Sequence, residues 1–412
     1  MKALYKYPQA AFPYDEIVDE NAKRSRHERE YELLDTGVFD ENRYFDLEIE
    51  YAKGSAQDVL IQLTVSNRGP EAAPVWLLPT LWYRNRWNFR PANPKPNISI
   101  VEEGHLAAKR HRIGTYHFYY DRSAERLLFT ENETNRVRVF DEDENPTEFV
   151  KDDFHTAVLN DDYDFLADKK DGTKTASLYH WTLAAGESKT LRLRLSQNPQ
   201  EDPLGEDFAQ VFAIRKQEAD EFYEGIHPKG LSKERRNIQR QALAGMLWTK
   251  QYYHIDVANW LEGDPNQPPP PQERKQGRNR NWMYLNNQDI LSMPDKWEYP
   301  WYAAWDLAFH CVPLAMVDIN FAKEQLILML REWYMAPNGQ IPAYEWNFSD
   351  VNPPVHAWAA LKIYQLEKAK TGKGDLHFLK RVFQKLAINF TWWVNRKDIN
   401  GNNVFEGGFL GL

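Results

Sequence analysis

Hydrophobic and polar positions alternate along the first half of the chain. Between residues 32 and 196, short runs with an apolar residue at every second position are separated by turn residues such as those at 67–70, which is the pattern of half-buried antiparallel strands. The predicted strands cover residues 44–52, 58–67, 75–85, 98–102, 116–121, 126–131, 135–140, 177–183 and 190–196. Nine short strands without intervening helices predict a β-sandwich.

The spacing becomes helical after a polar, proline-containing segment that begins near residue 197. Apolar residues then recur every three or four positions, for example at Phe208, Val211 and Phe212. We therefore predict a multidomain β plus α protein, with a β-sandwich over residues 1–200 and a helical domain over residues 201–412. The predicted helices are the linker helices within 205–255, one of them at 233–254, and those at 301–317, 320–334, 354–368 and 376–395.

The later predicted helices alternate with loops rich in Trp, Asn, Pro and Gly. Paired antiparallel helices with long loops at one end are typical of an α/α toroid, whose central cup is lined by those loops and by the helix starts. The first thirty residues begin in the middle of a pattern, without an evident helix cap or targeting signal. We interpret the chain as an internal portion of a longer protein, with an incomplete sandwich and about the first half of a toroid.

Composition and charge exclude several classes of protein. The 412 residues include 60 Asp and Glu against 51 Lys and Arg, which argues against a general nucleic-acid binder. The single cysteine rules out an internal disulfide and, without a signal peptide pattern, indicates a cytoplasmic protein. No apolar run approaches membrane-spanning length, so no membrane partner is expected. The sequence indicates no cofactor and leaves the oligomeric state open.

Aromatic residues and two isolated carboxylates are concentrated between residues 297 and 358. Indole and phenol rings offer flat apolar faces to a sugar ring, and carboxylates accept hydrogen bonds from its hydroxyls, so this stretch predicts a carbohydrate site. Asp306 lies within the apolar run WYAAWDLAFH, where burial without partners would be costly; a helix cap or a buried ion pair is the alternative. Glu345 is either a second sugar ligand or a solvated loop carboxylate.

Three further features have both a structural and a functional interpretation. His356 follows two prolines at a predicted helix start, where it is either an ordinary helix residue or a donor to a sugar hydroxyl. The adjacent His310 and Cys311 lack a second ligand pair, so we predict no zinc site. The proline-rich, basic loop 264–280 is either solvated or a docking or phosphate contact, and the solvated interpretation is favoured.

Three ordered motifs in the helical half resemble glycoside hydrolase family 63, the processing α-glucosidase family, and in particular its bacterial branch. They are YPWYAAWDLAFHCVPLAMVDINFAKEQL at 299–326, NGQIPAYEWNFSDVNPPVHAWA at 338–359 and NVFEGGFLGL at 403–412. The resemblance implies an inverting glycosidase with an (α/α)6 toroid and two widely spaced carboxylic residues as general acid and base. It also implies that Asp306 binds the sugar.

By the same resemblance, the general acid is expected immediately after Leu412, and the chain alone is expected to be inactive. The residues predicted to bind substrate are Trp301, Tyr302, Trp305, Asp306, Phe309, Tyr344, Glu345, Trp346, Asn347, His356, Trp358, Gly407, Gly408 and Phe409. Two alternatives stay open. One is a non-catalytic carbohydrate-binding or assembly protein, and the other is an α/α-toroid sugar phosphorylase, for which the basic residues at 274–280 are the local anion-site candidate.

Overall fold

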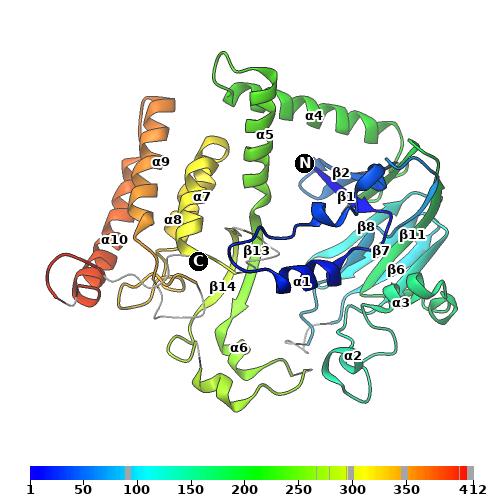
Figure 1. Ribbon diagram of the computed structural model, residues 1–412, viewed down its shortest axis with the longest axis horizontal. Coiled ribbons are helices and arrows are strands. Elements are labelled where there is room, and N and C mark those ends of the chain that lie inside the picture. The colour runs from blue at the N-terminus through cyan, green and yellow to red at the C-terminus, as the bar shows by residue number, and fades with distance from the viewer. Residues whose placement is uncertain are drawn as a thin grey trace. The chain divides into compact units, whose positions relative to one another are not determined.

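The computed structural model describes residues 1–88, 94–265, 267–277, 279–293, 295, 301–344, 351–398 and 400–405. The chain divides into two compact units, Met1–Ala219 (unit 1) and Asp220–Leu412 (unit 2). Unit 1 is rich in β-strands and unit 2 is mainly helical, so the predicted succession of a β part and an α part is confirmed (Figure 1). Helix α4 (Glu206–Ile226) contains the point at which the two units divide.

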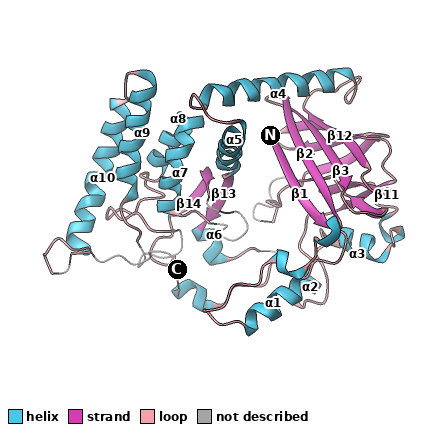
Figure 2. Ribbon diagram, turned by 45° about the horizontal axis from the view of Figure 1, so that its top comes forward, coloured by secondary structure: helices cyan, strands magenta, loops and turns pink. Residues whose placement is uncertain are grey.

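Unit 1 contains two antiparallel sheets, whose strands are magenta in Figure 2. In order across the larger sheet, the strands are β1 (Lys2–Pro8), β2 (Tyr44–Ser55), β3 (Asp58–Asn67), β12 (Ser188–Ser196), β8 (Gly114–Tyr120), β7 (His105–Arg110), β6 (Asn97–Glu102) and β10 (Asp171–Gly172). The smaller sheet contains β4 (Ala73–Leu77), β11 (Lys174–Leu183), β5 (Thr80–Trp82) and β9 (Arg126–Thr130). Alternation along β4 buries Ala73, Val75 and Leu77, which pack with Phe45 and Leu191 of the larger sheet.

Unit 1 also contains helices, which the alternating pattern did not predict. They are α1 (Tyr14–Lys23), α2 (Arg136–Phe140), α3 (Asp153–Asn160) and short 3-10 turns at Leu33–Thr36, Asp40–Asn42 and Asp164–Leu166. The strand predicted at 135–140 is therefore wrong. The Asn135 side chain accepts a hydrogen bond from the backbone N–H of Arg138, and the Asn145 side chain accepts from that of Arg136, so polar capping stabilises a helical turn there.

A buried ion pair holds the start of α4 on the larger sheet. Arg194 on β12 is 4% exposed and donates to both carboxylate oxygens of Asp58, at 2.9 Å and 2.7 Å. The same guanidinium donates to Asp207 in the first turn of α4 at 3.2 Å. Because Phe208 and Phe212 pack against Ala52 and Leu60, the first half of α4 belongs to the core of unit 1.

Unit 2 combines helices with one two-stranded ladder. Its elements are α5 (Lys233–Trp248), β13 (Lys250–Asp256), α6 (Val257–Glu262), a 3-10 turn (Gln272–Gln276), β14 (Asn286–Ser292), α7 (Ala304–Val317), α8 (Ile319–Leu328), α9 (Val355–Thr371) and α10 (Leu376–Arg396). Leu307, Leu314, Leu326 and Ile363 contribute to one core that joins α7, α8 and α9. These helices are drawn from yellow to orange in Figure 1.

Two helices of unit 2 are shorter than predicted. The helix predicted at 233–254 ends at Trp248, because the following residues pair with β14 from Lys250 opposite Ser292 to Asp256 opposite Asn286. The helix predicted at 320–334 ends at Leu328, and turns follow it. Along the described ranges, no helix combines the length and the apolar character needed to cross a bilayer.

Candidate functional site

Asp306 is the third residue of α7, and its carboxylate has few internal partners. The residue before the helix, Ala303, provides no side-chain cap. The half-buried carboxylate accepts a hydrogen bond from its own backbone N–H, and no other described residue donates to it. Burial raises the pKa of Asp306 above its ordinary value, although that hydrogen bond acts in the opposite direction. The alternative interpretation of Asp306, a side-chain partner in an ion pair, therefore finds no support among the described residues, and the carboxylate can accept further hydrogen bonds.

Aromatic side chains with free surface lie close to Asp306. The ring centroids of Trp305 and Phe309 are 6.1 Å apart, and those of Phe309 and Trp358 are 5.4 Å apart. Phe309 is 47% exposed and Trp358 is 43% exposed, which is unusual for large apolar side chains in helices that also build the core. The contact between Phe309 and Trp358 places the second turn of α7 beside the first turn of α9. Partly exposed rings beside an acceptor are the arrangement that a sugar ring requires.

His356 is the second residue of α9 and is only 4% exposed. Its Nε2 atom has no hydrogen-bond partner among the described residues. Burial lowers the pKa of His356 to about 4, so the imidazole is neutral at pH 7. A neutral ring with an unused nitrogen offers one donor or acceptor to a ligand. The structure thus brings His356 to the same end of α7 and α9 as Asp306.

The other predicted site residues have different positions. Tyr302 is 1% exposed and lies between Tyr253 and Tyr334 in edge-to-face contacts at 6.4 Å and 5.6 Å, so its ring belongs to the core. Trp301 and Tyr344 are half-buried, and the backbone beside Tyr344 is tied to the start of α7 by a hydrogen bond from Ala304 N–H to the Ala343 carbonyl at 2.8 Å. The predictions that lie outside the described residues are Glu345, Trp346, Asn347, Gly407, Gly408 and Phe409.

His310 and the proline-rich loop make structural contacts. His310 Nδ1 shares a hydrogen bond with Ser292 Oγ at 2.8 Å, and the described ranges contain no group of three His, Cys, Asp or Glu side chains that could hold a metal ion. Arg274 lies over the ring of Trp260 at 4.8 Å and donates to its carbonyl at 3.3 Å. Lys275 lies 3.6 Å from Glu262, so the two basic side chains are engaged on α6.

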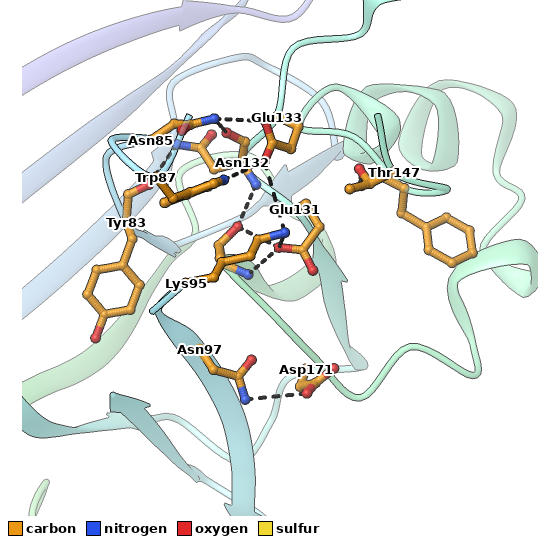
Figure 3. A network of polar contacts seen from close by, with 12 residues as sticks. Tyr83, Asn85, Trp87, Lys95, Asn97, Glu131, Asn132, Glu133, Thr147 and Asp171 are labelled. Carbon is orange, nitrogen blue, oxygen red and sulfur yellow. Dashed lines mark hydrogen bonds and ion pairs between the residues drawn. The ribbon is translucent and has the colours of Figure 1, made fainter. Parts of the chain in front are cut away.

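A polar network in unit 1 was not predicted from the sequence (Figure 3). Glu133 is 5% exposed and accepts hydrogen bonds from the side-chain nitrogens of Asn85 at 2.8 Å, Asn88 at 3.1 Å and Trp87. Its neighbour Glu131 accepts from Thr173 Oγ1 at 2.8 Å and pairs with two lysines, Lys95 at 3.1 Å and Lys169 at 3.3 Å. These internal donors occupy the carboxylates, so the network is suited to anchoring the segment around residue 87 after β5.

The pKa of Glu131 reflects this occupation. Burial alone would raise it, but the hydrogen bond from Thr173 and the charges of Lys95 and Lys169 outweigh burial and hold the pKa below its ordinary value. The only sequence signal for this network was the run of polar residues and tryptophan at 82–88, which carries no spacing that identifies a partner.

Comparison with known proteins bears on unit 2 most directly. Residues 299–407 match the family model described as the mannosylglycerate hydrolase MGH1-like glycoside hydrolase domain. The whole chain aligns with the uncharacterized protein YMR196W of Saccharomyces cerevisiae, with 44% identity over 457 positions, and the alignment covers 42% of that relative. The chain therefore spans less than half the length of this relative.

One solved structure that aligns with the chain is that of the polysaccharide lyase BACCELL_00875. The alignment covers 84% of this chain and 56% of the lyase chain, with 9% sequence identity and a TM-score of 0.25. A likeness at that score supports no conclusion about fold or function. The glucosidase branch of family 63 stays a prediction. The match of residues 299–407, which include Asp306, His356 and the exposed rings, supports a relationship to a glycoside hydrolase family.

Proposed function

We propose that the protein acts as an inverting glycosidase on α-glucosidic or related α-linked sugars. The observation that carries this proposal is the Asp306 carboxylate, left without a side-chain donor beside the partly exposed rings of Phe309 and Trp358, within the segment that matches a glycoside hydrolase domain. Asp306 accepts hydrogen bonds from sugar hydroxyls, and the rings contact the apolar face of the sugar. His356 adds a neutral nitrogen at the same end of the helices.

The proposed chemistry needs two further carboxylic groups. In an inverting glycosidase, a general acid protonates the leaving oxygen while a general base activates a water on the opposite face of the sugar, which requires a wide separation between the two groups. In this proposal Asp306 orients the sugar and takes no part in proton transfer. We also propose the β-sandwich and α/α-toroid architecture, and a reducing, cytoplasmic setting in which the buried Cys311 stays a thiol.

The test is a hydrolysis assay on the protein expressed from its complete reading frame. Maltose, methyl α-glucoside and mannosylglycerate are supplied separately; mannosylglycerate is included because the matching family model carries that name. Proton NMR follows the anomer released first. We expect turnover of an α-linked sugar with initial release of the β-anomer. Initial release of the α-anomer would contradict the inverting mechanism, whereas binding without turnover of any sugar would favour the non-catalytic alternative.

A further inference from the structure

Asn287 on β14 is fully buried, at 0% exposed, and its carboxamide is unused. Neither Nδ2 nor Oδ1 has a hydrogen-bond partner among the described residues. Buried carboxamides elsewhere in the chain are employed: Asn67 donates to the carbonyls of Glu71 and Leu183 at 2.7 Å and 2.9 Å, and Asn389 donates to that of Gly339 at 2.8 Å. A buried amide without partners destabilises a folded protein, so its presence needs a reason.

The contacts of β14 place Asn287 near the first turn of α7. At one end of the strand, Ser292 contacts His310 in the middle of α7. Three residues earlier, Asp289 accepts a hydrogen bond at 2.8 Å from the hydroxyl of Tyr334, whose ring packs on Tyr302 just before α7 begins. The strand thus runs in the same direction as α7, so that it approaches the helix start as residue numbers fall.

Asn287 precedes Asp289 by two residues, and side chains two residues apart in a strand lie on the same face. Asn287 therefore lies on the face of β14 that carries Asp289, at the end of the strand closest to the helix turn that holds Asp306. The two groups are complementary in chemistry, because the carboxylate only accepts hydrogen bonds whereas the carboxamide both accepts and donates them.

We propose that the Asn287 carboxamide binds the substrate sugar through two adjacent hydroxyls, one of which donates to Oδ1 while the other accepts from Nδ2. Each hydroxyl both donates and accepts, so a vicinal pair matches the two ends of the carboxamide. The inference rests on the proposed glycosidase function and adds a specificity-determining residue from outside the aromatic stretch. The competing explanation is a buried water that satisfies the amide, which would make Asn287 structural.

Two readouts on Asn287→Leu separate these explanations, and Asn389→Leu is the matched control. If the carboxamide is kept for a ligand, Asn287→Leu leaves the Tm equal to or above that of the wild type, because a similarly shaped apolar group replaces an unsatisfied one. Affinity for the sugar falls about tenfold, as expected for the loss of two neutral hydrogen bonds. Asn389→Leu lowers the Tm, because the Gly339 carbonyl loses its donor, and leaves the affinity unchanged.

Calorimetric titration with methyl α-glucoside, methyl α-mannoside and mannosylglycerate measures the affinity, and Asn287→Ala repeats the test without adding volume. A lowered Tm together with unchanged affinity in both Asn287 variants would overturn the inference and leave the proposed function intact. Failure of the wild type to bind any of the three sugars would instead overturn the proposed function, and this inference with it. Weaker binding of a sugar by both variants, together with an undiminished Tm for Asn287→Leu, supports the assignment.

Discussion

The two units surround particular carboxylates differently: those of the unit 1 network have several partners, whereas Asp306 of unit 2 has almost none within the described ranges. Glu133 in unit 1 accepts hydrogen bonds from three side chains, and Glu131 beside it is neutralised by Lys95 and Lys169. In unit 2, Asp306 accepts only from its own backbone N–H among the described residues, and its pKa is raised. A carboxylate whose oxygens already accept several internal hydrogen bonds can hold a loop in place. A carboxylate whose oxygens can accept further hydrogen bonds is a candidate for binding a ligand.

Two carboxamides and one imidazole show a similar difference, although unit 1 also holds a carboxamide oxygen without a partner among its described residues, Asn85 Oδ1. Asn67 in unit 1 uses both ends of its side chain, since Oδ1 also accepts from Gly69 N–H at 2.8 Å. Asn287 and His356 in unit 2 bury polar atoms that lack partners in the described part of the chain. Native proteins satisfy buried polar groups almost everywhere, so each exception has an energetic cost. Unit 1 has exceptions too, among them Ser177 Oγ, and what distinguishes His356 of unit 2 is that it lies in the segment that matches a glycoside hydrolase domain.

The largest effect is expected where the unit 1 network is broken. Glu133→Ala removes the acceptor shared by the side-chain N–H groups of Asn85, Trp87 and Asn88, of which only Asn85 keeps another among the described residues, the Asn132 carbonyl. The change should lower the free energy of unfolding by about 4 kcal/mol. Urea unfolding checks this, with hydrogen exchange of β5 and β9 to locate the loss. Glu148→Ala, at an exposed carboxylate of the same unit, should change stability by less than about 0.5 kcal/mol. Equally small changes in the free energy of unfolding for Glu133→Ala and Glu148→Ala would show that the partners of Glu133 add little stability, and would contradict the contrast with Asp306.

Acid should act on unit 2 through His356. Because burial lowers its folded-state pKa to about 4, below the ordinary 6.5, the unfolded chain binds a proton that the folded chain rejects between those values. Stability contributed by the neutral ring is therefore lost as pH falls from 6.5 toward 4, by about 1.4 kcal/mol per pH unit and about 3 kcal/mol in all. His356→Gln should remove this loss from an unfolding series over that pH range.

The control for the pH series is His111→Gln, because His111 is an exposed histidine of unit 1. It should leave the pH dependence of the wild type unchanged. If His356→Gln lost as much stability as the wild type on acidification, the loss would not come from His356. The imidazole would then have a partner in the folded protein.

Asp306→Asn should separate binding from stability. Replacing the charged acceptor weakens sugar affinity by about thirtyfold, the equivalent of one charge-assisted hydrogen bond, and kcat/KM falls with it. Stability should not fall at pH 7, because a carboxyl whose folded pKa is raised disfavours the folded state once pH rises above that pKa. Calorimetric titration and thermal unfolding measure both, with the exposed Glu324→Gln as control. A Tm several degrees lower in Asp306→Asn would assign the residue a structural role.

The sequence predicted the features that depend on residues close together in the chain, and it missed those that depend on distant residues. The change from alternating to helical spacing identified the β-rich and helical parts, and the helix starts at α7 and α9 gave Asp306 and His356 their positions. The failures depend on contacts distant in sequence. β13 forms a strand only because β14, which lies 30 to 42 residues later at the paired positions, pairs with it, and Glu133 meets donors nearly fifty residues earlier. The burial of Asn287 likewise depends on tertiary packing, which no local pattern records.

The smallest expected effect concerns the basic loop at 264–280, where basic side chains are engaged by neighbouring residues. Arg274 is half-buried over Trp260 and donates to its carbonyl, so Arg274→Ala should lower the free energy of unfolding by only about 0.5–1 kcal/mol. Because the guanidinium is already engaged, phosphate should neither stabilise the protein nor stimulate sugar cleavage, in the wild type or in the variant. Thermal unfolding and the hydrolysis assay with and without inorganic phosphate check this. A phosphate-dependent rise in Tm that Arg274→Ala abolishes would identify an anion site and revive the phosphorylase interpretation.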